Sequence, residues 1–480
     1  MQVSVGARPR WGNPIGARGT NTRHDQPPAD DLRRRRCRRH RRHRRATLRG
    51  RRRCRCRGPE RGIPPASQSP GAAARGRRAA GRARGHPRRA HRPGERLAVD
   101  SGFIVHNDRT YPVLRRIFDE LDIPTQETEM SMSVTCDGCG LSFAGAKGLG
   151  GLLAQPTRVL DRRYRRLLRE VPRFHRAALD ELAASRRGEA APITWGGFLE
   201  RGRFDPYFVQ HYAIPLISCV WSSGHEDAAA YPAHHLFEFL DHHGLLTVGG
   251  SPTWRTVVGG SRIYVERIRE ALLAAGATVR TGVPVTAVRR HADRVEVSTG
   301  GAAPATETVD RVVLATHADV ALRVLDDATE AERADLGSIR YSLNPTVLHT
   351  DPGVLPTARR ARAAWNYRLT GCEAREDRVL VSYWMNTLHR LGPDVPDDYV
   401  VTLNHVGRVD PARVLVEREY AHPVFTHEAI GAAARLREAG GPRLAFAGAH
   451  LGWGFHEDGA RSGLQAARAL EGELALGGVA

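Results

Sequence analysis

The chain has 480 residues, of which 41% are hydrophobic, so it is long enough to bury a sizeable core. Its formal net charge is +21, but residues 1–96 hold 30 arginines, no lysine and five acids, whereas the remainder holds 43 basic and 47 acidic residues. The composition therefore excludes a uniformly basic protein and separates an arginine-rich segment from a mildly acidic globular body.

The sequence shows no features typical of a membrane or a secreted protein. The chain contains no apolar run of about 18 residues, and its first 30 residues lack an apolar signal core. The body holds four cysteines without the spacing of a disulfide framework, which is typical of reduced thiols. We therefore expect a cytoplasmic protein.

The arginine-rich segment, residues 1–96, shows neither helical nor strand periodicity and has few large apolar side chains. Such a segment cannot offset its ordering entropy, so we expect it to be disordered.

Ordered structure is expected from about Leu97. Apolar residues at helical spacing predict a helix over 111–121, and an Asp-Gly turn predicts a hairpin over 130–145. Residues 156–185 predict a long basic amphipathic helix.

The second half of the body alternates strands with helices. A Gly-Gly turn near 259 precedes a helix, a short strand and a hairpin, and residues 309–325 predict strand, turn and helix. Residues 341–425 supply alternating strands, and residues 442–474 end the chain with strand, glycine-rich turn and helix. This order predicts a parallel α/β domain interrupted by an inserted domain of mixed character.

The last motif is the most informative. The strand Leu444–Phe446 leads into four glycines and then an alanine-rich helix. Glycines at a strand-to-helix turn allow a close approach of a ligand to the backbone, and the helix N-terminus offers unpaired N–H groups. A plain turn in which Asp458 caps the helix remains the alternative at this point. The glycines are Gly448, Gly452, Gly454 and Gly459.

This motif, "GWGFHEDGARSG", resembles the C-terminal flavin motif of the FAD-dependent amine oxidase and phytoene desaturase-like superfamily, and in particular its bacterial group of predicted NAD/FAD-binding proteins. Further stretches resemble the same superfamily in the same order, over about residues 97–470: "VDSGFIVHNDRTYPVLRRIFDELDI", "WRTVVGGSRIYVERI", "TGVPVTAVRR" and "VVLATHADVALRVL".

The resemblance implies FAD as cofactor and a discontinuous Rossmann-like FAD-binding domain with an inserted α+β substrate domain. The expected FAD-binding parts are 97–115, 254–330 and 440–480, and the expected substrate domain comprises 116–253 and 331–439. It also implies cofactor contacts at Asp100, Ser101, Gly102, Val285, Ala315, Thr316, Gly448, Gly454, Phe455, His456, Glu457, Asp458 and Gly459. Trp453 and His456 are candidates for facing the substrate, without an assigned acid–base role.

Other chemical signals are weaker. Cys136 and Cys139 form C-x-x-C, but a structural zinc site needs four ligands and no second pair follows. A redox dithiol is conceivable, and a plain turn is favoured. The histidine pairs at 234–235 and 242–243 are interpreted as surface or packing residues, so no metal site is predicted. Lys147 is the only lysine of the chain and lies outside the flavin motifs, so simple amine oxidation is not secured.

The superfamily opens with a strand and G-x-G-x-x-G, which holds the pyrophosphate, and an acid for the ribose about 20 residues later. No such fingerprint precedes Asp100. If arginine is encoded by CGN, reading one base later allows glycine at Arg39, Arg41 and Arg44, and Glu at Arg57. We therefore hypothesise that residues up to about Glu95 come from a shifted reading frame.

Three hypotheses follow. The first is a flavin-dependent oxidoreductase that moves a hydride from a C–N or C–C bond of a small or lipid-like substrate to FAD. The second is a nucleic-acid-binding protein that uses the basic segment, which is disfavoured because the segment lacks interleaved aromatics. The third is that the chain as written holds FAD poorly or is inactive. The sequence leaves the oligomeric state open.

Overall fold

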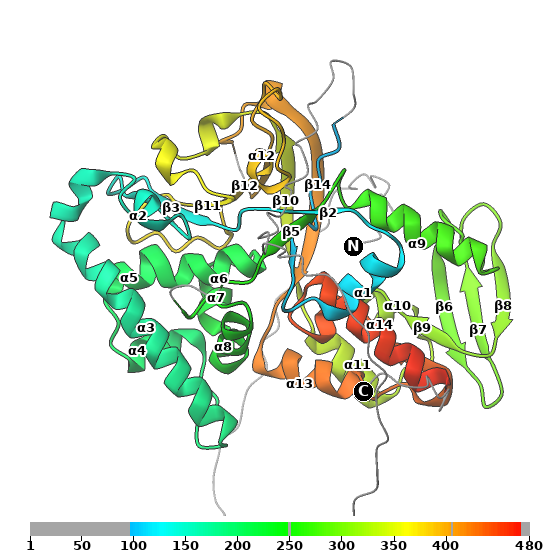
Figure 1. Ribbon diagram of the computed structural model, residues 1–480. Helices are drawn as coiled ribbons and strands as arrows, with labels where there is room; N and C mark the ends of the chain where they lie inside the picture. The colour runs from blue at the N-terminus through cyan, green and yellow to red at the C-terminus, as the bar shows by residue number, and fades with distance from the viewer. Residues whose placement is uncertain (1–96, 248–250, 405–406, 472–480) are drawn as a thin grey trace, which may run out of the picture. The chain divides into compact units, whose positions relative to one another are not determined.

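The computed structural model describes residues 97–247, 251–404 and 407–471, all of which belong to one compact unit. These residues form an α/β fold in which helices pack around four separate sheets (Figure 1). The predictions made for residues 1–96, namely disorder, nucleic-acid binding and a shifted frame, lie outside the described residues.

The largest sheet has seven strands in the order β14-β10-β13-β12-β11-β3-β4. All of its neighbouring pairs are antiparallel except β11 and β3, which are parallel. The predicted hairpin is present as β3 and β4. The strands are β3 (Met132–Cys136), β4 (Ser142–Gly145), β10 (Tyr341–His349), β11 (Trp365–Leu369), β12 (Val381–Trp384), β13 (Val400–Leu403) and β14 (Val414–Pro423).

A group of helices packs with this sheet in the largest hydrophobic core, which contains Trp195, Phe174 and Phe237. The predicted helix over 156–185 begins later, at Arg162, because Asp161 accepts the N–H of Arg163 and caps it after a 3₁₀ turn. The helices are α2 (Gly148–Leu152), α3 (Arg162–Arg186), α4 (Trp195–Arg201), α5 (Pro206–Phe208), α6 (Ile214–Trp221), α7 (His225–Ala230) and α8 (Ala233–His242), with α12 (Met385–Leu388) following β12.

A second core lies around a parallel pair, β9 (Val312–Leu314) and β15 (Leu444–Phe446). It includes residues of the antiparallel sheet β6-β7-β8, which starts at Val285. The other elements of this part are α9 (Arg262–Ala274), β6 (Val285–Arg290), β7 (Val295–Thr299), β8 (Ala305–Val309), α10 (Ala318–Val324), α11 (Glu330–Ser338), α13 (His427–Leu436) and α14 (His456–Glu471).

A smaller core joins the first described elements to α9. The predicted helix is present as α1 (Pro112–Glu120), and its Leu114 and Phe118 pack against Tyr264 of α9. The three-stranded sheet beside it has the order β1 (His106–Asn107), β5 (Trp254–Val257) and β2 (Thr125–Glu127). The start of the described chain is therefore tied to α9, while Val99, Ile104 and Val105 also pack against the largest core.

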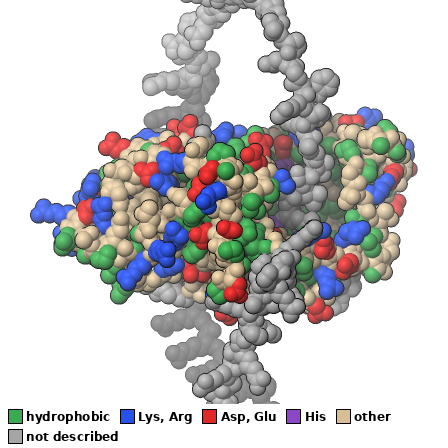
Figure 2. Space-filling view, turned by 90° about the horizontal axis from the view of Figure 1, so that it is seen from above, with side chains coloured by type: hydrophobic (Ala, Val, Ile, Leu, Met, Phe, Trp, Pro, Cys, Tyr) green, Lys and Arg blue, Asp and Glu red, His purple; other side chains and the backbone are tan. Residues whose placement is uncertain are grey.

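The surface of the body carries both signs of charge. Figure 2 shows basic and acidic side chains interspersed over the visible face. Within the described part of the chain, no helix is both long and apolar enough to pass through a bilayer.

Arg290 provides a test of the second core. Its guanidinium contacts both carboxylate oxygens of the buried Glu332 at 2.6 and 2.7 Å, and Asp327 at 2.8 Å. Arg290→Met leaves Glu332 without its cation, so we expect a loss of about 3 kcal/mol in unfolding free energy, measured by urea denaturation. The matched control is Arg280→Met, because the pair Arg280–Glu307 is exposed and its loss should change little. Equal losses of unfolding free energy in the two variants would contradict the conclusion that Arg290 stabilises the buried Glu332.

Candidate flavin site

The parallel strands β9 and β15 end at the same edge of their sheet. Leu314 pairs with Phe446, and the N–H of Ala447 donates to the Leu314 carbonyl at 3.0 Å. Beyond these ends lie Ala315 and Thr316, both exposed, and Gly448. Crevices at the carboxyl ends of parallel strands are where α/β folds bind nucleotides. The structure thus brings three predicted cofactor residues together.

Gly448 has no room for a side chain. A Cβ at this position would meet the ring of His450 and approach the Thr316 carbonyl oxygen at 3.5 Å. The backbone is held by Ser462 of α14, whose hydroxyl accepts from the Gly448 N–H at 2.9 Å. The backbones of the two strand ends therefore lie close together at this edge of the sheet.

The glycine-rich turn after Gly448 also depends on absent side chains. A Cβ on Gly452 would overlap the carboxylate of Asp458, and Gly454 has φ +92°, which disfavours other residues. Asp458 accepts the N–H of Phe455 at 3.0 Å and pairs with Arg461 at 2.5 Å. Asp458, the third residue of α14, therefore satisfies the N–H that precedes the helix, so the capping contact considered as the alternative is present.

The Glu457 carboxylate caps the start of α1 and is therefore engaged within the protein. Its two carboxylate oxygens accept the N–H groups of Val113 and Leu114, at 3.1 and 2.9 Å, where α1 begins without a capping side chain of its own. Burial raises the pKa of Glu457, and burial likewise raises the pKa of Asp458. Because both carboxylates are engaged, this turn has mainly backbone atoms to offer a cofactor.

His456 lies between two aromatic rings. It stacks on Phe103 with ring centroids 3.9 Å apart, and its Nδ1 lies 2.9 Å from the hydroxyl of Tyr264. Burial lowers the pKa of His456 well below its usual value, so the ring is uncharged at neutral pH. A cationic role for His456 is thereby disfavoured.

The segment Asp100–Gly102 adjoins the start of α9. Asp100 accepts from the N–H and hydroxyl of Ser261, with distances of 2.7–3.0 Å, and approaches Nε2 of His389 at 3.5 Å. Ser101 shares a 2.6 Å hydrogen bond with Tyr420 of β14, and Gly102 is exposed. Asp100 thus orders the Gly-Gly turn before α9.

Trp453 and Phe455 lie in an aromatic box formed with α6, α8 and their connection. The Trp453 indole N–H donates to the His235 carbonyl, and its own carbonyl accepts from the Trp221 indole. Phe455 stacks on Phe239 with centroids 5.1 Å apart. The other rings of the box belong to Tyr231, His243 and Phe425.

Val285 lies in a different sheet from the other predicted residues. It opens β6, pairs with Thr299 in the antiparallel sheet and is 42% exposed. Sequence reasoning missed Tyr264, His389, Tyr420 and His450, which contact predicted site residues from other elements. His450 alone had a local signal, because it stands two residues after Gly448 in the glycine-rich turn.

The part of the fold that would face a dinucleotide is incomplete among the described residues. β9 and β15 form only a two-stranded parallel sheet, whereas parallel sheets are normally larger and covered on both faces. Val313 of β9 is 40% exposed, and Leu272 and Leu273 of α9 are 45% and 42% exposed. The described residues therefore fit the C-terminal half of an FAD cradle and leave apolar groups uncovered beside it.

Comparison with known proteins identifies the family. A profile of the family described as flavin containing amine oxidoreductase matches residues 77–347, more than half of the chain. The chain belongs to the flavin-containing amine oxidoreductase family. It is therefore an oxidoreductase of a family that uses FAD. No curated protein sequence matches the chain.

Solved structures of similar fold agree with this family. Cyclohexylamine oxidase from Brevibacterium oxydans IH-35A is 13% identical with a TM-score of 0.51, over 78% of this chain and 87% of that one. A single-residue variant of putrescine oxidase is 14% identical with a TM-score of 0.51, over 80% and 92%. A CLA-producing fatty acid isomerase from P. acnes is 14% identical with a TM-score of 0.51, over 76% and 85%. At these identities the likeness shows the fold alone.

Glu457 gives a stability prediction for this amine oxidoreductase-family member. Glu457→Ala leaves two backbone N–H groups of α1 without acceptors, so we expect a loss of about 1–3 kcal/mol in unfolding free energy. Glu457→Gln retains one acceptor oxygen and should lose less. Urea denaturation measures both, with the exposed Glu438→Ala as control. A wild-type midpoint in Glu457→Ala would refute the capping role.

Three buried histidines predict how the folding stability of the chain depends on pH. Burial is the main cause that lowers the pKa of His106, His243 and His450 to about 4. They stay neutral in the folded chain, whereas the unfolded chain takes up protons below its ordinary pKa of about 6.5. Their stabilising contribution is therefore present above pH 6.5 and lost as the pH falls towards 4.

We expect the unfolding free energy, measured by urea denaturation, to fall between pH 7 and pH 5 by up to about 2 kcal/mol for each such histidine. In His243→Gln the fall should be shallower, because the hydrogen-bonded ring between Thr110 and the Phe239 carbonyl is removed. His427→Gln, on the exposed start of α13, is the control. Parallel pH profiles for wild type and His243→Gln would contradict the prediction.

Proposed function

We propose that the body of this flavin-family oxidoreductase removes a hydride from a C–N or C–C bond of a small or lipid-like substrate and passes it to FAD. The observation that carries the proposal is the edge of the sheet where the ends of β9 and β15 meet the glycine-rich turn before α14, which would form the cofactor crevice. FAD supplies the hydride acceptor, and the protein orients it and excludes water.

Backbone groups would hold the cofactor in this crevice. Ala315, Thr316 and Gly448 lie at the strand ends, and Gly454 to Gly459 form the turn and the start of α14. Asp100 to Gly102 would approach from the side of α9, and Val285 would contact the adenine side from β6. In this proposal 97–115, 254–330 and 440–480 form the FAD-binding domain, and 116–253 and 331–439 form the substrate domain.

The aromatic box suits a substrate that carries an apolar group. Trp453 and Phe455 connect the turn to Trp221 and Phe239 of the helical group, so rings would surround the approach to the flavin and keep water out. The similar structures include two enzymes named for amines and one named for a fatty acid. Lys147 binds Glu129 and the Arg362 carbonyl near β4 and makes no contact with the rings of this box. It therefore does not help to decide between an amine and a lipid-like substrate.

We propose further that the chain as written retains FAD weakly. The exposed side chains of Leu272, Leu273 and Val313 support this, because a first strand–helix–strand unit would cover apolar groups at such positions. The reading frame one base later over residues 33–60 would encode that unit.

A spectroscopic comparison tests both proposals. The chain as written and a chain with the restored frame are purified in the presence of FAD, desalted and examined by visible absorption. We expect oxidised-flavin bands in the restored chain and little or none in the chain as written. Absence of flavin from both would overturn the oxidoreductase proposal, and equal flavin in both would overturn the frame proposal.

A pair of variants in the restored chain localises the site. Gly448→Ala adds a Cβ that meets His450, so we expect flavin retention to fall by at least about tenfold, roughly 1.4 kcal/mol. Gly463→Ala on α14 adds a Cβ in open space and should retain flavin like the parent. Unchanged retention in Gly448→Ala would place the cofactor elsewhere.

A further inference from the structure

Three cysteines and one histidine from three distant segments meet beside the large sheet. Cys136 ends β3, Cys139 follows in the hairpin turn, His211 lies in the π-helical turn Val209–Ala213, and Cys372 follows β11. One potential ligand atom from each lies within 4.8 Å of every other. The sequence offered only the C-x-x-C pair, and the chain fold adds the third and fourth donors.

The distances suit a tetrahedral metal centre. The Sγ atoms of Cys136 and Cys372 are 3.8 Å apart, and Cys139 Sγ is 3.7 Å from Nε2 of His211. With zinc–sulfur and zinc–nitrogen bonds of about 2.3 and 2.0–2.1 Å, tetrahedral ligands are separated by roughly 3.6–3.8 Å. A disulfide would bring two sulfurs to about 2.05 Å, and all four cysteines of the described chain are free.

The turn between the two cysteines is shaped for this approach. The Gly140 N–H donates to the Cys136 carbonyl at 2.9 Å, and Gly140 has φ +69°. A Cβ on Gly138 would lie 3.0 Å from the backbone nitrogen of Cys372. Glycine at this position therefore lets the hairpin turn pack directly on the segment that carries the third cysteine.

The histidine is oriented by a second contact. Nδ1 of the fully buried His211 lies 3.0 Å from the Tyr207 carbonyl, which acts as acceptor and leaves Nε2 facing the sulfurs. Metal-binding histidines are commonly held in this way. π-Helical turns such as the one that carries His211 are frequent at functional sites.

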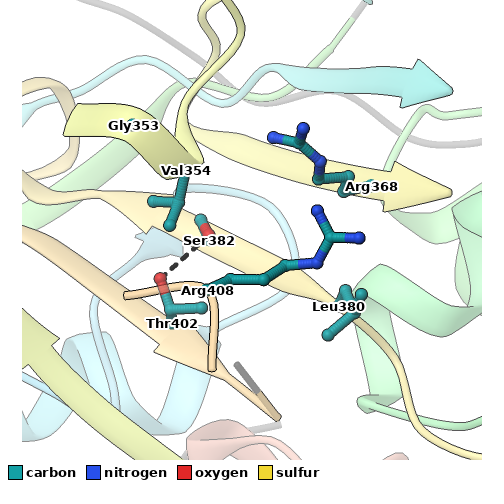
Figure 3. A pocket seen from close by; sticks show the side chains of 7 residues that line it. All are labelled: Gly353, Val354, Arg368, Leu380, Ser382, Thr402 and Arg408. Carbon is teal, nitrogen blue, oxygen red and sulfur yellow. Dashed lines mark hydrogen bonds between the residues drawn. The ribbon is translucent and has the colours of Figure 1, made fainter. Parts of the chain in front are cut away.

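Charged neighbours hold the turn in place. Asp137, between the two cysteines, pairs with Arg368 at 2.9 Å and with Arg408 at 3.2 Å. Both arginines, drawn in Figure 3, line a cavity of about 230 Å³. The Arg158 side chain also donates to the Cys139 carbonyl at 2.5 Å.

We propose that Cys136, Cys139, His211 and Cys372 bind one zinc ion as a closed structural site. Thiolate and imidazole donors favour zinc over magnesium or calcium, and four protein ligands leave no open position for a substrate. The ion would link the β3–β4 hairpin, the helical group and the segment after β11. These strands lie at the edge of the seven-stranded sheet opposite β14, whose Tyr420 contacts Ser101 beside the flavin crevice.

Metal analysis of the full-length chain tests the site. The protein is equilibrated with zinc, desalted and analysed by mass spectrometry for metal content, with about one tightly bound zinc per chain expected. Cys372→Ser should lose this zinc. Cys219→Ala, at a buried cysteine outside the cluster, and a triple variant with Cys37, Cys54 and Cys56 replaced by serine should keep it. Zinc that depends only on the triple-variant cysteines would overturn the proposal.

Cobalt substitution needs no variant and therefore does not depend on mutant folding. Replacing zinc by Co²⁺ in the wild-type chain should produce the visible ligand-field bands of a tetrahedral thiolate site, which zinc suppresses on addition. Removal of the metal by a chelator should lower the thermal unfolding midpoint. Absence of these bands, or a disulfide between Cys136 and either other cysteine in zinc-treated protein, would overturn the proposal.

Discussion

The adjacency of two parallel strands, β9 and β15, governs the organisation of the body. Parallel neighbours cannot be joined by a hairpin, so the chain must leave the end of β9 and return to the start of β15 in the same direction. All of residues 315–443 lie in this excursion, including five of the seven strands of the large sheet. The proposed cofactor-binding part is interrupted between its second and third pieces for this reason, and the two strands that pair there lie on either side of the excursion.

Buried polar groups then determine where α14 begins. Glu457, Asp458 and Ser462 each satisfy backbone N–H groups of a neighbouring segment, and a buried carboxylate without such partners would be costly. These bonds join α14 to α1 and to the glycine-rich turn. The same turn inserts Trp453 and Phe455 among the rings of the helical group, so polar and aromatic contacts together join the turn to the aromatic box.

The cysteine–histidine cluster lies toward the other edge of the large sheet, and its proposed role is separate from cofactor binding. It brings His211 of the helical group to the ends of β3 and β11, which already pair with one another in the large sheet. A closed metal centre there would stabilise the hairpin and the helical group independently of the flavin crevice. FAD would then stabilise the cofactor-binding part, and the metal ion would stabilise the inserted part.

The sequence by itself determined the features that rest on local chemistry. The spacing of Val113, Leu114, Ile117 and Phe118 predicts α1 within about a residue, and the Asp-Gly turn predicts the β3–β4 hairpin. The split in charge and the glycine-rich flavin motif are likewise visible in the printed letters, because both depend on residues close together in the chain.

Only the tertiary structure decided which distant residues meet. Glu457 caps α1 from more than three hundred residues away, Tyr420 bonds to Ser101, and His211 and Cys372 join the C-x-x-C turn. Such contacts leave no periodic signal, because each depends on how the excursion between β9 and β15 folds and returns. The early start predicted for α3 was wrong for a local reason, since the cap at Asp161 outweighs the apolar pattern that precedes it.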